Sequence, residues 1–319
     1  MVRAESAGPA DAMTMSCTEK GGLGGTRQSE TFYYTGFGKG DEIADYSWNY
    51  KTDGETVRNA TIFYYGTAEV EASASGVMDA MTRSDTRRDS LAGTLQNQTY
   101  YYTGFGKGDE IADYSYNYRT DGATIRNVSI FFYGTDEVRA ASADSSDPMS
   151  RTDSRRESLT GVLEAGTLQS QTYYYTGFGK GDEIANYAFN YRTDGATIKN
   201  VSIFYYGTAE TRAEFSSTAD AMSRSDSLKE SLAGVLQSQT YYYTGFGKGD
   251  EIADYSLNYT FDGSRVKSTS IFYYGTAETR ADAPVRGLYE RGTAVLPDRR
   301  NGFAGLRAPL VLSDRKSVV

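Results

Sequence analysis

The pattern of apolar and polar positions predicts short β-strands that return along the chain. Within residues 99–134, three runs rich in aromatic and β-branched residues have the composition of strands: Tyr100–Tyr102, Ile111–Arg119 and Ile125–Tyr133. A glycine-rich loop, GFGKG at 104–108, separates the first two runs, and an Asp-Gly pair at 121–122 marks a hairpin turn between the last two. This segment therefore predicts a three-stranded antiparallel meander.

Alternation along the second strand assigns its two faces. Tyr114, Tyr116 and Tyr118 fall on one face, and polar residues fall on the other. The residue at position 116 becomes Trp48, Phe189 and Leu257 in the other copies, so this position accepts any bulky apolar side chain. We therefore expect the tyrosine face to pack against the body of the fold. In the third strand, the apolar face is formed by Val128, Ile130 and Phe132.

The polar, serine-rich segments between the meanders predict linkers that carry short helices. Leu228, Leu232 and Leu236 recur at helical spacing together with Val235, and Ser225 could cap the start of such a helix. Gly234 interrupts the pattern. The alternative is that this segment extends the following strand backwards.

One twelve-residue stretch, TGFGKGDEIADY, recurs and divides the chain into units. Its copies lie at Thr35–Tyr46, Thr103–Tyr114, Thr176–Tyr187 (with Asn186 for Asp) and Thr244–Tyr255. The sequence predicts an all-β fold with minor α content, a tandem array of about four three-stranded tyrosine-rich units. The predicted divisions are a partial unit (1–30), units one to four (31–98, 99–171, 172–239 and 240–282) and a non-repeating tail (283–319).

The sequences at the two ends of the chain lead to separate expectations. Residues 2–31 match residues 211–240 without a gap, so we expect a fragment of a longer array whose targeting signal lies upstream. The final six residues, DRKSVV, resemble a translated sequencing adapter, so we expect the tail to be an assembly artefact. The alternative is a genuine solvated tail.

Composition narrows the classes of function. The net charge of −9 argues against a nucleic-acid partner, and no apolar run is long enough for membrane insertion. Histidine is absent, and the single cysteine, Cys17, stands where other copies have Asp85, Asp153 and Asp226. The commonest general base and metal ligand are thus missing, and we expect no enzyme.

Carboxylates beside the glycine-rich loop give one candidate site. Ca²⁺ prefers several oxygen ligands, and it is the only cofactor that this composition suggests. The candidate ligands are Asp41, Glu42, Asp109, Glu110, Asp182, Glu183, Asp250 and Glu251. The alternative is a hairpin loop with solvated acids.

Tyrosines in the first strand of each meander give a second candidate site. A flat ring with a polar hydroxyl can stack on a sugar, so an exposed tyrosine could serve as a carbohydrate platform. The candidates are Tyr33, Tyr101, Tyr174 and Tyr242. The alternative is that these rings pack in a tyrosine-rich core.

Two families resemble the strand half of the unit. The tyrosines of the second strand, the Asp-Gly turn and the final Phe132-Tyr133-Gly134 resemble the tyrosine-rich YD repeats of Rhs and teneurin-like proteins. The same hairpin is similar to aromatic repeats that bind cell walls and glucans. The first resemblance implies β-hairpins in large extracellular shells or stalks, and the second implies carbohydrate binding.

Near-identical units favour a structural or adhesive segment of a larger protein, because an enzyme needs one differentiated site. We expect a cell-surface or secreted parent protein, with neighbouring repeats and surface glycans as partners. The alternative is a multivalent carbohydrate-binding module, in which weak sites gain by avidity. An intracellular scaffold is a third possibility, which the lack of disulfides permits.

Overall fold

Nearly all of the regular secondary structure in the described part of the chain is β-strand. The computed structural model describes residues 8–156, 163–275 and 278–281. Helical structure in this part of the chain is limited to three-residue 3₁₀ turns: η2 (Ala72–Ala74), η3 (Ala140–Ser142), η4 (Leu163–Ala165) and η5 (Ala213–Phe215). The all-β prediction is confirmed, and the expected minor helical content is confined to these turns.

Eighteen strands form one sheet, and two short strands form a second pair. The first strands of the chain are β1 (Met15–Lys20), β2 (Thr26–Tyr34), β3 (Ile43–Tyr50), β4 (Val57–Tyr65), β5 (Val70–Glu71) and β6 (Met81–Arg88). The next are β7 (Leu95–Tyr102), β8 (Ile111–Tyr118), β9 (Ile125–Tyr133), β10 (Val138–Arg139) and β11 (Met149–Arg156). They are followed by β12 (Thr167–Tyr175), β13 (Ile184–Tyr191), β14 (Ile198–Tyr206) and β15 (Met222–Lys229). The last are β16 (Leu236–Tyr243), β17 (Ile252–Tyr259), β18 (Val266–Ile271), β19 (Tyr273–Tyr274) and β20 (Thr279–Arg280).

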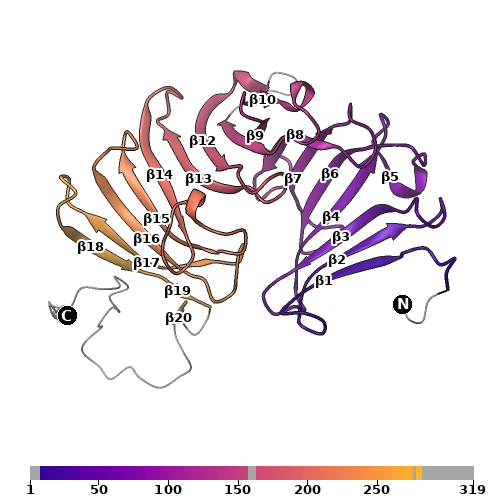
Figure 1. Cartoon of the computed structure of the whole chain (residues 1–319), viewed down its shortest axis with the longest axis horizontal. Coiled ribbons are helices and arrows are strands. Elements are labelled where there is room, and N and C mark those ends of the chain that lie inside the picture. Colours follow the sequence, from indigo (N-terminus) through magenta and orange to yellow (C-terminus); the bar gives the residue numbers. More distant parts are fainter. Residues whose placement is uncertain (1–7, 157–162, 276–277, 282–319) are drawn as a thin grey trace.

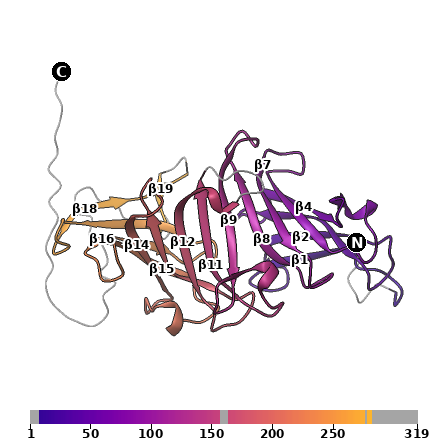
Figure 2. The same ribbon diagram turned by 90° about the horizontal axis from the view of Figure 1, so that it is seen from above.

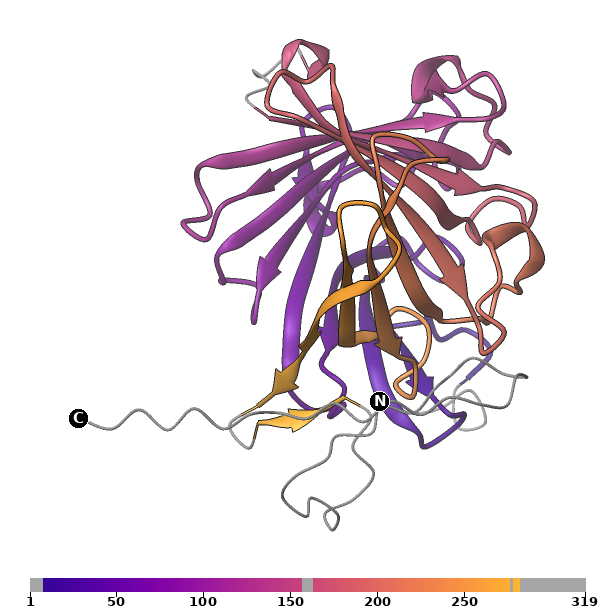
Figure 3. The same ribbon diagram turned by 90° about the vertical axis from the view of Figure 1, so that its left-hand side faces the viewer.

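The long strands pair with their sequence neighbours in an antiparallel meander. Pairing runs from β1 through β2, β3, β4, β6 and β7 and continues in the same way to β18, while the short β5 and β10 lie beside β4 and β9. The sheet curves into an arch, with β9 to β12 near its crest (Figure 1). Seen from above, β1 and β18 lie at opposite ends of the arch (Figure 2). The end-on view shows how strongly the strands turn relative to one another (Figure 3).

A bulge at the same place in each meander contributes to this curvature. Tyr100 pairs with Tyr114 but Tyr101 pairs with Ala112, so Asp113 of β8 has no partner on β7. The pairings β2–β3, β12–β13 and β16–β17 skip the corresponding residue. Because a bulge bends a strand and increases its twist, its regular recurrence favours a curved sheet.

The predicted tyrosine face of β8 and the apolar face of β9 lie on the same side of the sheet and pack side by side. Tyr116, Val128, Ile130 and Phe132 form a buried cluster, and Val128 and Ile130 are fully inaccessible to solvent. The rings of Tyr100 and Tyr114 stack against this cluster, with centroids 4.8 Å apart. The interpretation of these positions as packing residues is confirmed.

The predicted linker helix is wrong. Ser225 and Leu228 belong to β15, Leu236 begins β16, and a turn closed by the bond from Lys229 N to Val235 O (2.8 Å) joins the two strands. Leu232 and Val235 are exposed, so the helical spacing of apolar residues does not correspond to a buried face. The alternative, in which the segment extends the following strand backwards, is correct.

The serine-rich polar segments therefore include long strands. β6, β11 and β15 each lie between two tyrosine-rich strands, and they are more polar than expected for the interior of a sheet. The predicted tail, 283–319 with its DRKSVV end, lies outside the described residues. No helix in the described ranges is long and apolar enough to span a membrane.

Candidate functional site: the recurrent glycine-rich loop

The loop between β7 and β8 has a backbone that requires its glycines. Gly106 and Gly108 have φ angles of 95° and 93°, which residues other than glycine rarely adopt. A Cβ atom on Gly104 would lie 2.1 Å from the hydroxyl of Tyr102, so this glycine leaves room for the tyrosine ring. Phe105 meets the same ring edge-on, with centroids 5.2 Å apart. The GFGKG motif is thus the packing unit of one tight loop.

The glutamate of the loop joins it to the chain segment before the preceding hairpin. Glu110 Oε2 accepts a hydrogen bond from Gly108 N (2.9 Å), and Oε1 accepts one from Met81 N at the start of β6 (2.8 Å). Glu42, Glu183 and Glu251 make the same pair of bonds, to Met13, Met149 and Met222 and to the glycine two residues before each glutamate. Each carboxylate therefore fixes its own loop and holds a strand that begins about thirty residues earlier.

The lysine of the loop makes a second link to the same segment. Lys107 Nζ donates to the carbonyl of Val77 (2.7 Å). Lys180 and Lys248 donate to Ser145 O (2.6 Å) and Thr218 O (2.8 Å), and Lys39 donates to Pro9 O. We call each lysine and glutamate pair, with the backbone groups it binds, the loop staple.

The aspartate beside each glutamate plays no comparable part. Asp41, Asp109 and Asp182 are exposed, and Asp250 Oδ1 lies 3.8 Å from Arg58 Nη1. Nowhere in the described ranges do three acidic or cysteine side chains gather in a group that could hold a metal ion. The eight candidate calcium ligands therefore divide into four staple glutamates and four aspartates, and no third ligand joins a pair. Calcium binding stays a prediction.

The four candidate platform tyrosines are half-buried, and their hydroxyls already have partners. Tyr33, Tyr101 and Tyr242 lie 3.0–3.1 Å from the hydroxyls of Ser16, Ser84 and Ser225. The hydroxyl of Tyr174 accepts from Thr152 at 3.4 Å. Burial raises the pKa of Tyr101. The structure thus places all four against the neighbouring strand, and sugar binding at these rings stays a prediction.

The residue skipped by the bulge is used in an ion pair. Asp113 accepts from Arg139 (2.7 Å), and Asp254 accepts from Arg280 through both carboxylate oxygens (2.8 Å each). Asn186 accepts from Arg212 at 2.5 Å, so the exchange of Asp for Asn keeps the contact. The first unit differs, because Glu71 stands at the position of these arginines. Burial and the charge of Glu71 raise the pKa of Asp45.

Replacing Glu71 with arginine should therefore stabilise the protein. The change removes a repulsion and supplies the ion pair seen in the other units, so we expect a gain of about 1 kcal/mol at neutral pH. Since the pKa of Asp45 is raised in the folded state, its cost is full above the folded pKa and disappears once the carboxyl is protonated. The gain should therefore begin to shrink as the pH falls through the raised pKa of Asp45, and the repulsion is gone below about pH 4, where the unfolded carboxyl is protonated as well. Urea unfolding at neutral pH and below about pH 4 measures the gain in stability. Glu71→Gln removes only the repulsion, so it should stabilise the protein less than Glu71→Arg does. A loss of stability in Glu71→Arg would show that position 71 is not structurally equivalent to the arginines of the other units.

A second recurrent group, which sequence reasoning missed, lies in the polar strands. Asp153 of β11 is 2% exposed, and it accepts from Arg151 Nε (2.9 Å) and Gln171 Nε2 (3.0 Å). Arg151 also pairs with Glu137 and lies over the ring of Phe132, 4.0 Å from its centroid. We call this group the arginine network. Equivalent networks surround Asp85 (Arg83, Glu69, Gln98, Tyr64) and Asp226 (Arg224, Glu210, Gln239, Tyr205).

The corresponding place in β1 has no such network. Met15 and Cys17 stand where β11 has arginine and aspartate, and Glu30 of β2 stands where β12 has Gln171. Glu30 instead pairs with Arg27 (3.3 Å) and accepts from the hydroxyl of Tyr50 (2.6 Å). The edge strand β1 thus carries an apolar version of the polar strand.

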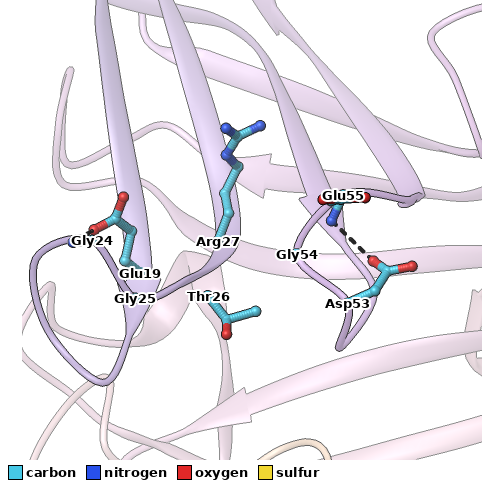
Figure 4. Close-up of a pocket in the computed structure, with 8 residues that line it drawn as sticks. All are labelled: Glu19, Gly24, Gly25, Thr26, Arg27, Asp53, Gly54 and Glu55. Atoms are coloured by element: carbon cyan, nitrogen blue, oxygen red, sulfur yellow. Dashed lines mark hydrogen bonds between the residues drawn. The ribbon is translucent and has the colours of Figure 1, made fainter.

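A pocket lies at the turns that follow β1 and β3 (Figure 4). It is lined by Glu19, Gly24, Gly25, Thr26, Arg27, Asp53, Gly54 and Glu55. Its carboxylates bind their own turns. Glu19 accepts from Gly24 N (2.6 Å), and Asp53 accepts from Glu55 N (3.0 Å) and twice from Thr56. The bonds from Thr56 and Glu55 lower the pKa of Asp53 to about 2. The same arrangement returns at Asp121 and Asp194, so the pocket reflects turn geometry rather than a distinct site.

No protein-family model matches the chain, and no curated protein is significantly similar to it. The resemblance to YD and cell-wall-binding repeats therefore has no support beyond the residues that suggested it. The arginine network did carry a sequence signal. The pattern Arg-x-Asp recurs at the same place in three units, at 83–85, 151–153 and 224–226.

Proposed function

We propose that the chain is a structural array, in which each unit is docked on the one before it through the loop staple. One observation carries this proposal. The most regular stretch of the sequence uses its polar and glycine residues for internal contacts. Its glycines form the turn, its lysine and glutamate bind the preceding segment, and its final acidic or amide residue lies at the bulge. The four tandem units of the sequence correspond, in this proposal, to four mechanical repeats of one sheet.

The wider setting is part of the same proposal. We infer that the array is a structural or adhesive segment of a larger, surface-exposed or secreted protein, because equal units suit a spacer better than a catalyst. A multivalent carbohydrate-binding module is less well supported. Its four platform tyrosines use their hydroxyls within the sheet, so only ring surface is left for a sugar.

Replacing Glu110 with alanine tests the staple. The substitution leaves the backbone N–H groups of Gly108 and Met81 without their acceptor. We therefore expect the free energy of unfolding to fall by about 2 kcal/mol. Thermal unfolding measures the loss. Hydrogen exchange should also accelerate at the start of β6, about thirty residues from the substitution, and that change separates a staple from a local loop defect.

The adjacent aspartate supplies a matched control. Asp109 is exposed, so Asp109→Ala should change stability by less than about 0.5 kcal/mol. Millimolar Ca²⁺ should not shift the melting temperature of the parent protein or of either variant. A calcium-dependent rise in melting temperature that Asp109→Ala abolishes would instead make the loop a metal site and overturn the proposal.

A further inference from the structure

The two edge strands of the described sheet are equivalent to strands that pair with each other elsewhere in it. β18 corresponds to β4, β9 and β14, each of which is covered by the next polar strand, β6, β11 or β15. β1 corresponds to those polar strands, and it pairs on one side only, with β2. No strand in the described part of the chain pairs with the outer edge of β1 or of β18. Each edge is therefore the complement of the other.

The equivalence fixes the register that the two edges would adopt. In the three internal pairs, Ile62 lies opposite Asp85, Ile130 opposite Asp153 and Ile203 opposite Asp226. The matching residues of the edges are Ile271 in β18 and Cys17 in β1. Likewise, Tyr64 lies opposite Arg83. Tyr273 corresponds to Tyr64, and Met15 corresponds to Arg83.

The edge strands are also matched in chemistry. Internal strands place an arginine over the aromatic ring at the position of Tyr273, and that arginine needs buried carboxylates. β1 offers a thioether and a thiol instead, which can pack on Tyr273 and Ile271 without partner charges. Tyr273 is 58% exposed and its neighbour Phe272 is 37% exposed, whereas Phe132 at the equivalent of Tyr273 is 9% exposed. The end of β18 and the start of β19 therefore carry an apolar strip of the kind that the polar strand covers elsewhere.

The N-terminal segment is already held in the conformation that this pairing needs. Glu42 binds Met13 N and Lys39 binds Pro9 O, as the equivalent staples do before β6, β11 and β15. Within one chain, β1 pairs with β2 and β18 pairs with β17, and the described residues show no pairing between β1 and β18. Where the N-terminal half approaches the C-terminal half, Arg58 meets Asp250 in the loop between β16 and β17, 3.8 Å away. β1 and β18 lie at opposite ends of the arch (Figures 1 and 2).

We propose that the outer edge of β18 pairs with β1 of a second copy of this chain, in the register Ile271 opposite Cys17. The contact is heterologous, so it generates open head-to-tail filaments rather than closed dimers. This inference rests on the proposed structural array, and it names a partner for the two edge strands of the described sheet.

The single native cysteine makes the register testable. Directly opposed residues of antiparallel strands have Cα atoms about 4.5–5.5 Å apart, which is within the range that a disulfide spans. Ile271→Cys in the full chain should therefore form Cys17 to residue-271 disulfides between copies under mild oxidation. Non-reducing electrophoresis should show a ladder of dimers and longer species, at least fivefold more abundant than in Ser270→Cys, which is one residue out of register.

Two further controls show which cysteines form the ladder. The parent protein reports links between two copies of Cys17, and Cys17→Ser with Ile271→Cys reports links between two substituted positions; both should give little product. An Ile271→Cys ladder no stronger than that of Ser270→Cys would overturn the proposal. So would an intrachain disulfide, seen as a monomer two mass units lighter in intact mass spectrometry.

Sedimentation of proteins without new cysteines gives an independent readout. The average mass of the parent should rise with concentration, and Tyr273→Lys should reduce that rise at least threefold. Phe215→Lys changes an aromatic residue that is 76% exposed away from both edges, and it should have no effect. A parent that stays monomeric at high concentration overturns the pairing. The Glu110→Ala experiment reports on the internal staples alone, so failure of the edge pairing and failure of the proposed array are distinguishable.

Discussion

Replacement of Arg151 by methionine should destabilise the protein by about 3 kcal/mol. The guanidinium donates to Asp153 at 2.9 Å, pairs with Glu137 and lies 4.0 Å from the ring centroid of Phe132. Asp153 is 2% exposed, so the substitution leaves a buried carboxylate with only Gln171 and the more distant Arg155 (3.6 Å) as partners. Breaking a buried ion pair from one side costs about 3–5 kcal/mol, and the remaining contacts place the loss at the low end. Urea unfolding followed by circular dichroism measures it.

The chain itself suggests the control. β1 carries Met15 and Cys17 at the corresponding positions, so Arg151→Met combined with Asp153→Cys reproduces a pair that the protein already uses. The double variant removes the unpaired charge and should recover more than half of the loss, which a double-mutant cycle quantifies. Glu137 is partly exposed and can turn to solvent. If the double variant is as unstable as the sum of the single ones, the network is not a coupled unit.

The strand half of the unit was readable from sequence because its apolar positions alternate. The cluster of Tyr116, Val128 and Ile130 follows directly from period-two patterning. The polar strands were missed because their buried residues are charged. In β11 the position that faces the apolar strip holds Asp153, which periodicity treats as a surface residue. The partners Arg151, Gln171 and Arg155 make that burial acceptable, and they become visible only in three dimensions.

The helix prediction failed for a related reason. Leu228, Leu232 and Leu236 share helical spacing, but Leu228 and Leu236 belong to paired strands and Leu232 to the turn between them. Glu230 in this turn has a φ angle of 60°, which a continuing helix does not allow. A six-residue turn between two strands happened to reproduce the helical period, and tertiary pairing decided the outcome.

The loop was identified from sequence, but its role was not. Internal identity pointed to GKGDE as a candidate ligand set, since carboxylates beside glycines are typical of cation sites. The partners of Glu110 and Lys107 are backbone groups of Met81 and Val77, about thirty residues earlier. No side-chain pattern marks a backbone partner, so sequence alone could not separate a staple from a ligand.

Raising the pH above about 10 should unfold the protein in one steep step. Tyr65, Tyr133 and Tyr206 are buried, and the hydroxyl of each donates a hydrogen bond to a backbone carbonyl at 2.5 Å. Burial raises the pKa of all three hydroxyls. Burial also raises the pKa of Tyr114 to about 12. An unfolded tyrosine ionises near pH 10, so above that pH the unfolded chain releases protons that the folded chain keeps. Stability is therefore full below about pH 10 and falls as the pH rises.

The size of this effect follows from the number of tyrosines that titrate together. Each buried tyrosine removes about 1.4 kcal/mol of stability per pH unit above its unfolded pKa, so the three with carbonyl partners alone remove about 4 kcal/mol per unit. Absorbance at 295 nm reports tyrosinate, and far-UV circular dichroism reports the sheet. The two transitions should coincide, because these hydroxyls can ionise only after the strands separate.

Substitution of single hydroxyls assigns the effect. Tyr133→Phe should lower stability at pH 7 by about 1 kcal/mol, through loss of the bond to Ala112, and should also make the alkaline transition less steep by one proton. Tyr274→Phe is the matched control, because the same bond to Ala253 is made by a half-buried residue next to the free edge of β18. Its effect should be smaller in both respects. Tyrosine absorbance that rises near pH 10 while the circular dichroism stays constant would show that the rings ionise within the folded sheet, and the hydroxyl-to-carbonyl bonds would then contribute little to holding the array together.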